Sequence, residues 1–128
     1  MEERAGRKIL VVDDDPGVRD VIRSMLESAG YQVLAAENGK EAMKILKSAR
    51  VDLILTDLVM PEQEGIETIK TLRRDYPDVK VIAMSGAFGG DYLRIASYLG
   101  AHGTLPKPIQ MPALLNLIAE TLGEEPGD

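Results

Sequence analysis

Several kinds of residue are absent from this sequence or rare in it, and each absence excludes a class of protein. The 128 residues include no cysteine, so disulfide bonds and thiolate metal sites are excluded. Aromatic residues make up 4% and tryptophan is absent, which argues against a surface that stacks nucleic-acid bases. No apolar run is long enough to cross a membrane, and no signal-peptide-like apolar segment follows the charged start. We therefore expect a cytoplasmic protein with no membrane partner.

The balance of charged and apolar residues is that of one ordinary globular domain. Lysine and arginine number 15 against 21 acidic residues, and the net charge of −6 argues against direct binding of nucleic acid. Hydrophobic residues make up 45%, enough for a sizeable core at this length. We expect a single domain over 1–128, with its core at about 8–122 and polar tails at 1–6 and 123–128.

One apolar run that ends in acid organises the chain. Lys8–Val12 is rich in Ile, Leu and Val, which is typical of a strand buried on both faces in a parallel sheet. Asp13, Asp14 and Asp15 follow it and cannot enter the core unpaired, because burying a lone charge costs too much. Asp15 is well placed to cap a helix that begins at Pro16, but that role leaves Asp13 and Asp14 unexplained. These two acids favour a metal or phosphate site at the end of the strand.

Strands and helices alternate along the rest of the sequence. Apolar runs predict strands over 8–12, 31–36, 51–56, 79–84 and 102–105, and helical spacing predicts helices over about 18–29, 42–49, 66–74, 92–99 and 114–122. Five such repeats predict an α/β fold with a parallel sheet and right-handed crossovers. The flavodoxin-like (βα)5 three-layer sandwich, with strand order 2-1-3-4-5, fits this pattern best.

The expected sheet brings several polar side chains to one edge. Its switch point lies between the first and third strands, and both of these strands lead into aspartate. We therefore expect Asp13, Asp14 and Asp57 to converge there. Ser85 follows the fourth strand and Lys107 the fifth, so both belong to the same edge. Alone, Ser85 is typical of a turn and Lys107 of a solvated surface, but with the acids they indicate a phosphoryl-binding site.

The chemistry of these groups favours phosphoryl transfer to a carboxylate. Asp14 and Asp57 can ligate Mg²⁺, with Asp13 helping directly or through water, because Mg²⁺ prefers oxygen ligands. The metal would neutralise charge on an incoming phosphoryl group, and a carboxylate can act as the nucleophile. Asp57 is the best candidate because it is the lone acid at the end of its strand. Lys107 supplies a positive charge opposite the acids, and Ser85 a hydroxyl donor.

The chain resembles the response-regulator receiver domain of two-component and phosphorelay systems. The resemblance covers about 8–122 and is carried by Asp13-Asp14 after Val11-Val12, Leu55-Thr56-Asp57, Met60-Pro61, Gly65, Ser85-Gly86 and Lys107-Pro108. It implies that Asp57 takes a phosphoryl group from a sensor histidine kinase or a histidine phosphotransfer protein. It also implies that Mg²⁺ is bound by Asp14, Asp57 and the backbone carbonyl of Val59, with Asp13 acting through water. A partner or output domain would read the face made by the fourth helix, the fifth strand and the fifth helix.

The switch residues follow the family pattern only in part. The resemblance implies that Ser85 and Lys107 contact the phosphoryl oxygens, that Ser85 moves toward them on activation, and that the Lys107–Pro108 bond is cis. Thr104 stands where the family commonly has Tyr or Phe, so we expect a smaller movement of Ser85 and its loop to carry the signal. Val59 has no polar group to orient an attacking water, which predicts slow self-dephosphorylation.

Two other functions stay open on the sequence alone. A Mg²⁺-dependent phosphohydrolase would form the same aspartyl phosphate, but it needs a second carboxylate two residues after the nucleophile, where Val59 stands. The spacing of Asp13 and Asp15 keeps this alternative alive. The complete set of acids, together with Ser85 and Lys107, argues against an inert interaction module with the same fold. His102, the single histidine, is expected to lie in a loop or at a strand edge rather than act as a base.

Overall fold

The computed structural model describes residues 6–58, 64–86 and 91–124, in which strands and helices alternate. The elements are β1 (Lys8–Val12), α2 (Pro16–Ser28), β2 (Gln32–Ala36), α3 (Gly39–Ser48), β3 (Leu53–Asp57), α4 (Glu64–Asp75), β4 (Lys80–Ser85), α5 (Asp91–Tyr98), β5 (Gly103–Pro106) and α6 (Met111–Leu122). All ten predicted elements are present, and their ends differ from the predictions by at most three residues. None of the helices in these described ranges is long and apolar enough to cross a bilayer.

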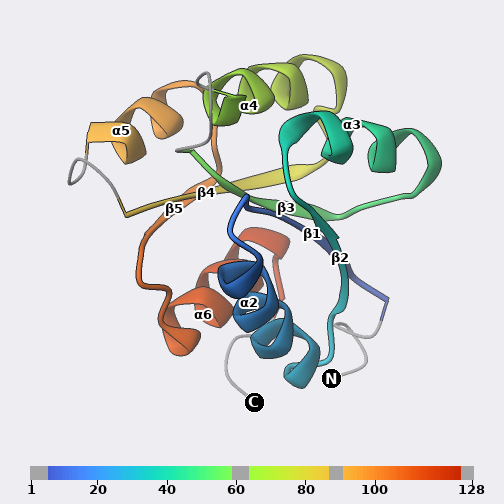
Figure 1. Ribbon diagram of the computed structural model, residues 1–128, viewed down its shortest axis with the longest axis vertical. Coiled ribbons are helices and arrows are strands. Elements are labelled where there is room, and N and C mark those ends of the chain that lie inside the picture. The colour runs from blue at the N-terminus through green and yellow to red at the C-terminus, as the bar shows by residue number, and fades with distance from the viewer. Residues whose placement is uncertain (1–5, 59–63, 87–90, 125–128) are drawn as a thin grey trace.

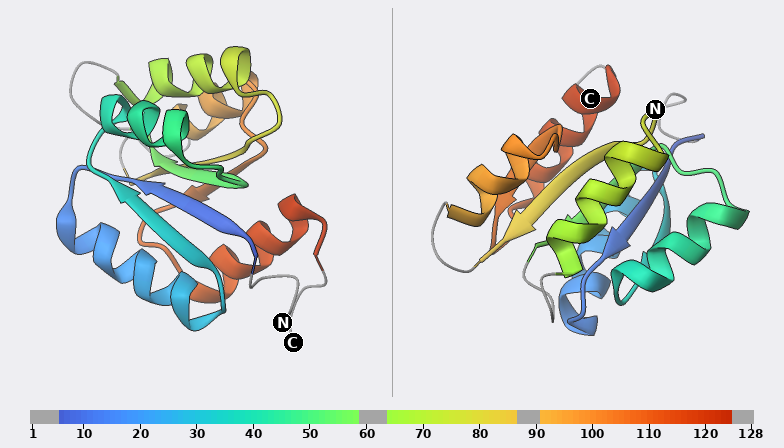
Figure 2. Two further views of the ribbon diagram at one scale, coloured as in Figure 1. Left: turned by 90° about the vertical axis from the view of Figure 1, so that its right-hand side faces the viewer. Right: turned by 90° about the horizontal axis from the view of Figure 1, so that it is seen from above.

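The five strands form one parallel sheet with the order β2-β1-β3-β4-β5, as predicted (Figure 1). Helices α3, α4 and α5 cover one face of the sheet and α2 and α6 cover the other, which gives the expected three layers (Figures 1 and 2). The order reverses between β1 and β3, where Val12 lies beside Thr56. The next residues along the two strands, Asp13 just after β1 and Asp57 at the end of β3, therefore lie side by side at this edge of the sheet.

The sheet separates the core into two clusters of buried apolar side chains. Along β1, Ile9 and Val11 pack with α2 and α6, whereas Leu10 and Val12 pack with α3 and α4. Successive side chains of a strand point to opposite faces, so only an almost wholly apolar strand can fill both clusters. The prediction that β1 is buried on both faces is confirmed, since the last four residues of this strand are buried.

The predicted helix cap positions the start of α2 beside the acids. The carboxylate of Asp15 accepts hydrogen bonds from the backbone N–H groups of Gly17 and Val18, at 2.9 and 3.3 Å. Pro16 occupies the first turn, where a missing N–H donor carries no penalty. Asp15 therefore caps the helix, and this leaves Asp13 and Asp14 available for the site.

His102 lies just before β5 and extends the pairing of that strand with β4. The ring Nδ1 of His102 accepts a hydrogen bond from the backbone N–H of Val81 at 3.0 Å. The backbone N–H of His102 donates to the Val81 carbonyl at 2.7 Å. Partial burial lowers the pKa of the imidazole, and the positive charges of Arg73 and Lys80 act in the same direction. His102 is thus an exposed residue at the edge of the strand, as predicted, and its ring makes a structural hydrogen bond.

The expected polar tail beyond residue 122 begins with a buried acid. Glu124 is only 7% exposed, and its carboxylate accepts a hydrogen bond from the Tyr31 hydroxyl at 2.7 Å. Its other oxygen lies 3.2 Å from the Arg7 guanidinium. The backbone N–H of Glu124 also donates to the Ala119 carbonyl at 2.8 Å, past the left-handed Gly123 (φ +73°). The end of α6 is thus fastened to the starts of β1 and β2, which composition alone did not reveal.

Replacing Tyr31 with phenylalanine is expected to lower the free energy of unfolding by about 1.5 kcal/mol, because a hydrogen bond to a buried carboxylate is lost. Urea denaturation followed by circular dichroism would measure the change. Tyr98→Phe is the matched control, since Tyr98 is 92% exposed and its change should stay within about 0.5 kcal/mol. Equal effects of the two substitutions would show that the contact between Tyr31 and Glu124 does not stabilise the fold.

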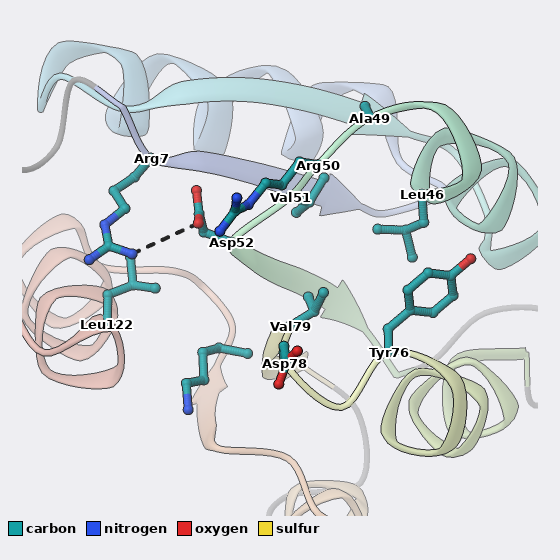
Figure 3. Close-up of a pocket in the computed structure, with 11 residues that line it drawn as sticks. Arg7, Leu46, Ala49, Arg50, Val51, Asp52, Tyr76, Asp78, Val79 and Leu122 are labelled. Atoms are coloured by element: carbon teal, nitrogen blue, oxygen red, sulfur yellow. Dashed lines mark ion pairs between the residues drawn. The ribbon is translucent and has the colours of Figure 1, made fainter.

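A hollow of about 430 Å³ lies at the edge of the sheet where β3 and β4 begin (Figure 3). Arg7 and Asp52 line it on one side, with the guanidinium 3.8 Å from the carboxylate, and Tyr76 and Val79 line it on the other. The Asp52 carboxylate also accepts a hydrogen bond from the backbone N–H of Lys8 at 2.8 Å. This edge is opposite the one at which the acids leave β1 and β3, so the hollow is separate from the acidic site.

Candidate functional site

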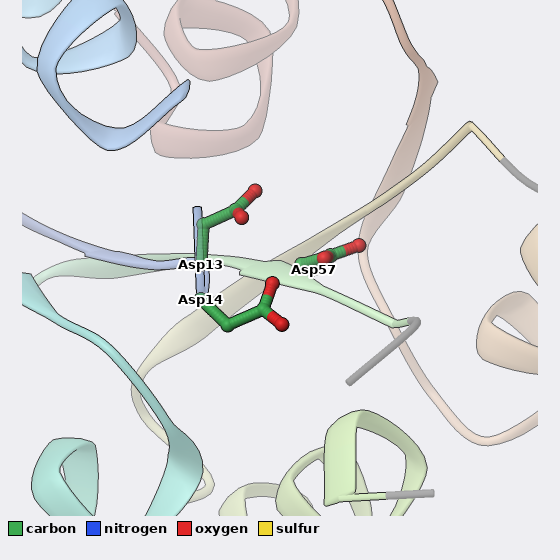
Figure 4. Close-up of side chains that lie close together, drawn as sticks. All are labelled: Asp13, Asp14 and Asp57. Carbon is green, nitrogen blue, oxygen red and sulfur yellow. The ribbon is translucent and has the colours of Figure 1, made fainter. Parts of the chain in front are cut away.

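Three carboxylates converge at the carboxyl ends of β1 and β3 (Figure 4). One oxygen from each of Asp13, Asp14 and Asp57 lies within 4.8 Å of the other two. Asp13 is fully buried and Asp57 is 3% exposed, whereas Asp14 faces solvent. The convergence predicted from the strand order is therefore confirmed. The cluster is buried at Asp13 and Asp57 and open to solvent at Asp14.

Hydrogen bonds within the connection from β1 to α2 fix the direction of Asp13. Its backbone N–H donates to the Ala36 carbonyl at 3.2 Å, which continues the pairing of β1 with β2. One carboxylate oxygen accepts from the Asp15 N–H at 2.9 Å, which leaves the second oxygen for the site. Asp13 is thus held from two sides before any ligand is considered.

Lys107 supplies the positive charge that the buried acids require. Its ammonium lies 2.7 Å from a carboxylate oxygen of Asp13 and 3.4 Å from one of Asp57. Burial alone would lower the pKa of Lys107, but the hydrogen bond to Asp13 and the charge of Asp57 outweigh it, so the pKa lies above its ordinary value. Lys107 is therefore a cation throughout the physiological range, and sequence reasoning placed it correctly at this edge.

The neighbouring ends of β4 and β5 position Lys107 beside the acids. Ser85, the last residue of β4, is 1% exposed and accepts a backbone hydrogen bond from the Lys107 N–H at 3.0 Å. A Cβ atom on Gly86 would lie 3.1 Å from the Lys107 Cβ, so glycine leaves the room that this side chain uses. The bond from Lys107 to Pro108 is cis. Ser85 and Lys107 therefore meet at the same edge as the carboxylates.

Two other predicted site residues differ in what the structure reveals. Thr104 lies in β5 opposite Ala83 and is half-buried. Its neighbour Leu105 packs in the cluster under α2 and α6, so Thr104 faces the α5 side of the sheet. Val59, whose backbone carbonyl is the expected third metal ligand, lies outside the described residues.

Sequence reasoning missed two residues that shape the site. The sequence pattern gives Arg19 no role at the site, but its guanidinium donates to the backbone carbonyl of Asp13 at 2.6 Å. Gly65 belongs to the motif that carries the family resemblance, but the motif alone gives it no physical role. A Cβ there would lie 2.6 Å from the Asp57 carbonyl oxygen, so only glycine lets α4 begin this close to the end of β3. Neither contact has a signal in local periodicity.

The donor set fits a hard divalent cation. Three carboxylates within 4.8 Å offer oxygen ligands only, and the exposed side of the cluster at Asp14 leaves room for water and for a phosphoryl group. Mg²⁺ typically uses few carboxylates and completes its shell with water or phosphate oxygens. With Lys107 opposite, the same arrangement suits an anion that carries its charge on several oxygens.

An apolar groove opens beside the acids, between α2 and the connection from β5 to α6. It has a volume of about 740 Å³, and Val18, Val21 and Ile109 line it together with Asp15 and Lys107. The Val21 side chain is 54% exposed and presents apolar surface to this groove. A macromolecule bound over this groove would lie next to the carboxylates.

Known proteins share this sequence pattern and this geometry. A family model for the response regulator receiver domain matches residues 9–119. The DNA-binding transcriptional regulator NtrC of Rhizobium meliloti (strain 1021) is 33% identical over 119 residues, which are 93% of this chain and 25% of that protein. The chain spans less than half the length of the curated relatives it matches.

Solved structures agree in fold. A receiver domain protein (CheY-like) from Methanospirillum hungatei JF-1 superposes with a TM-score of 0.84 and 29% identity, covering 91% of this chain and 94% of that one. The response regulator protein TrrA from Thermotoga maritima, solved in complex with Mg(2+)-BeF, gives a TM-score of 0.80 and 30% identity, with 90% and 98% covered.

Proposed function

Because the chain belongs to the response regulator receiver domain family, a family of signalling switches, we propose that Asp57 is its phosphoacceptor. The observation that carries this proposal is the meeting of Asp57 with Asp13, Asp14 and Lys107 at the switch point of the sheet. The donor would be a phosphohistidine on a sensor histidine kinase or a histidine phosphotransfer protein. The apolar groove next to Lys107 offers such a protein a surface beside the acceptor.

The transfer assigns a separate task to each side chain. An oxygen of Asp57 forms a bond to phosphorus as the phosphorus–nitrogen bond of the donor histidine breaks, and the released imidazole nitrogen regains a proton. Lys107 and the hydroxyl of Ser85 stabilise negative charge on the phosphoryl oxygens. These roles are supported by the position of both residues at the edge of the sheet that carries Asp57.

Magnesium is proposed as the cofactor of this transfer. Asp14, Asp57 and the carbonyl of Val59 would hold it, with Asp13 acting through water. The bound cation would supply positive charge opposite the phosphoryl oxygens, in addition to the charge of Lys107. The support in this chain is the oxygen-only donor set with one open side.

The face that carries the signal is proposed to be the one formed by α5, β5 and α6. Ile95 and Tyr98 on α5 are 43% and 92% exposed, and Met111 at the start of α6 is 38% exposed. Exposed apolar side chains on both helices beside β5 support this choice of partner surface. With Thr104 in place of an aromatic residue, movement of Ser85 would alter this face through β4 and β5.

The wider setting of the domain is also a proposal. Residues 8–122 would form one receiver unit acting in the cytoplasm, either alone or as part of a longer protein. Because Val59 has no polar group to orient water, the aspartyl phosphate is expected to be lost slowly. The chain would catalyse its own phosphorylation without releasing a metabolic product.

Intact mass after incubation with Mg²⁺ and acetyl phosphate tests the proposal. The parent chain should gain the mass of one phosphoryl group, as the bond between the acetyl oxygen and phosphorus breaks and acetate leaves. Asp57→Asn should gain none, while Asp75→Asn, a change at an exposed acid that pairs with Arg74, should behave like the parent. A phosphoryl gain by Asp57→Asn, or none by the parent with a cognate kinase also present, would overturn the assignment.

A further inference from the structure

Arg19 lies on α2 and reaches back to the acidic connection. Its Nη1 donates to the backbone carbonyl of Asp13 at 2.6 Å, and its own backbone N–H donates to the Asp15 carbonyl at 3.0 Å. The Asp15 N–H in turn donates to the Asp13 carboxylate at 2.9 Å. These three hydrogen bonds close a ring across the turn between β1 and α2.

The carbonyl that Arg19 holds belongs to the peptide unit joining Asp13 to Asp14. Because a peptide unit is planar, fixing its carbonyl also fixes the direction in which the Asp14 backbone continues. Within the described ranges, the Asp14 carboxylate makes no hydrogen bond or ion pair of its own. The backbone therefore sets where this side chain starts and which way its Cα–Cβ bond points, and Arg19 is the side chain seen to hold that peptide.

We propose that Arg19 is a positioning residue of the cation site, which aims the Asp14 carboxylate at the ion that it shares with Asp57. This inference rests on the proposed function, since it presumes that the acids bind Mg²⁺. Substitution of a residue that orients a metal ligand without touching the metal typically lowers metal affinity by 10–100-fold. Arg19 would act through the backbone of the ligand rather than through its carboxylate.

The sign of the effect separates positioning from simple electrostatics. A guanidinium beside three carboxylates opposes the binding of a cation, so loss of its charge alone should tighten Mg²⁺ binding. Loss of the hydrogen bond to the Asp13 carbonyl should weaken binding, because Asp14 is then no longer aimed. The two explanations therefore predict opposite changes in the dissociation constant.

Titration calorimetry with MgCl₂ is the test, on the parent chain, Arg19→Met, Arg19→Lys and Arg23→Met. The Arg19→Met substitution should raise the Mg²⁺ dissociation constant about tenfold, and Arg19→Lys should restore part of the affinity because an ammonium can still donate to the carbonyl. Arg23 lies one turn further along α2, paired with Glu27 at 3.5 Å on the surface, so Arg23→Met should change the constant less than about twofold. Amide hydrogen exchange at Asp15 without Mg²⁺ should quicken in Arg19→Met only.

Each outcome decides between the proposals. Unchanged or tighter Mg²⁺ binding by a folded Arg19→Met, with normal binding by the parent, would overturn the role of Arg19 and leave the phosphoacceptor assignment intact. An absence of Mg²⁺ binding by the parent chain would overturn both the metal site and this inference. Circular dichroism shows which variants are folded, and Arg19→Lys decides the matter if Arg19→Met is not.

Discussion

Replacing Lys107 with methionine is expected to lower the free energy of unfolding without Mg²⁺ by about 2–3 kcal/mol. Asp13 and Asp57 are almost completely buried, and Lys107 is their partner at 2.7 and 3.4 Å. Methionine keeps an apolar chain of similar length but leaves two carboxylates facing each other without compensating charge. The expected loss is smaller than for a wholly enclosed pair, because Asp14 opens the cluster to water.

Urea denaturation with and without Mg²⁺ measures this effect and its cause. A cation bound by the acids replaces the missing positive charge, so the loss in Lys107→Met should shrink once Mg²⁺ is saturating. Lys70→Met is the matched control, because the Lys70 side chain is 55% exposed and pairs with Glu67 at 3.8 Å on the surface. If Lys107→Met and Lys70→Met unfold alike without Mg²⁺, Lys107 does not stabilise the buried acids.

The raised pKa of Lys107 also sets the direction of a pH effect. A lysine whose pKa is higher in the folded chain stabilises the fold fully below its unfolded pKa of about 10.5. That contribution is lost as the pH rises through the folded pKa. The parent chain should therefore lose stability in this alkaline range, and Lys107→Met should lack that step.

Most of the fold followed from local patterns in the sequence. The runs at β1 and β3 are apolar on both faces, which only a sheet covered by two layers of helices can accommodate. Asp15 and Pro16 mark the start of α2 through their own side chains, so this start could be predicted. The end at Glu124 could not, because burial of that acid depends on Tyr31 and Arg7, which are far away in the sequence.

The residues of the candidate site also separate into those that the sequence could predict and those that it could not. Asp13, Asp14 and Asp57 were predictable because parallel strands deliver their carboxyl ends to one edge, and the strand order fixes which ends are neighbours. Arg19 was not, since a hydrogen bond to a backbone carbonyl leaves no requirement on the residue type at the acceptor. Contacts set by backbone approach require the three-dimensional structure.

Gly65 gives the clearest example of such an approach, and Gly65→Ala is expected to destabilise the chain by about 2 kcal/mol. The added Cβ would lie 2.5 Å from the Leu58 carbonyl oxygen and 2.6 Å from that of Asp57. Both atoms belong to the backbone, so no side-chain rotation can relieve the contact. Alanine is the better helix former by about 1 kcal/mol, so the net loss would be less than the clash alone implies.

The same substitution should also affect Mg²⁺ binding and phosphoryl transfer, because the backbone that must move carries Asp57. We expect Gly65→Ala to raise the Mg²⁺ dissociation constant and to slow phosphoryl gain from acetyl phosphate. Both are measured without urea, at a temperature at which the variant is folded. Gly6→Ala is the control, since no atom lies within 4 Å of a Cβ at that position. A variant that is less stable yet binds Mg²⁺ and accepts the phosphoryl group at the parent rate would show that α4 yields to the added methyl group and that β3 keeps its place.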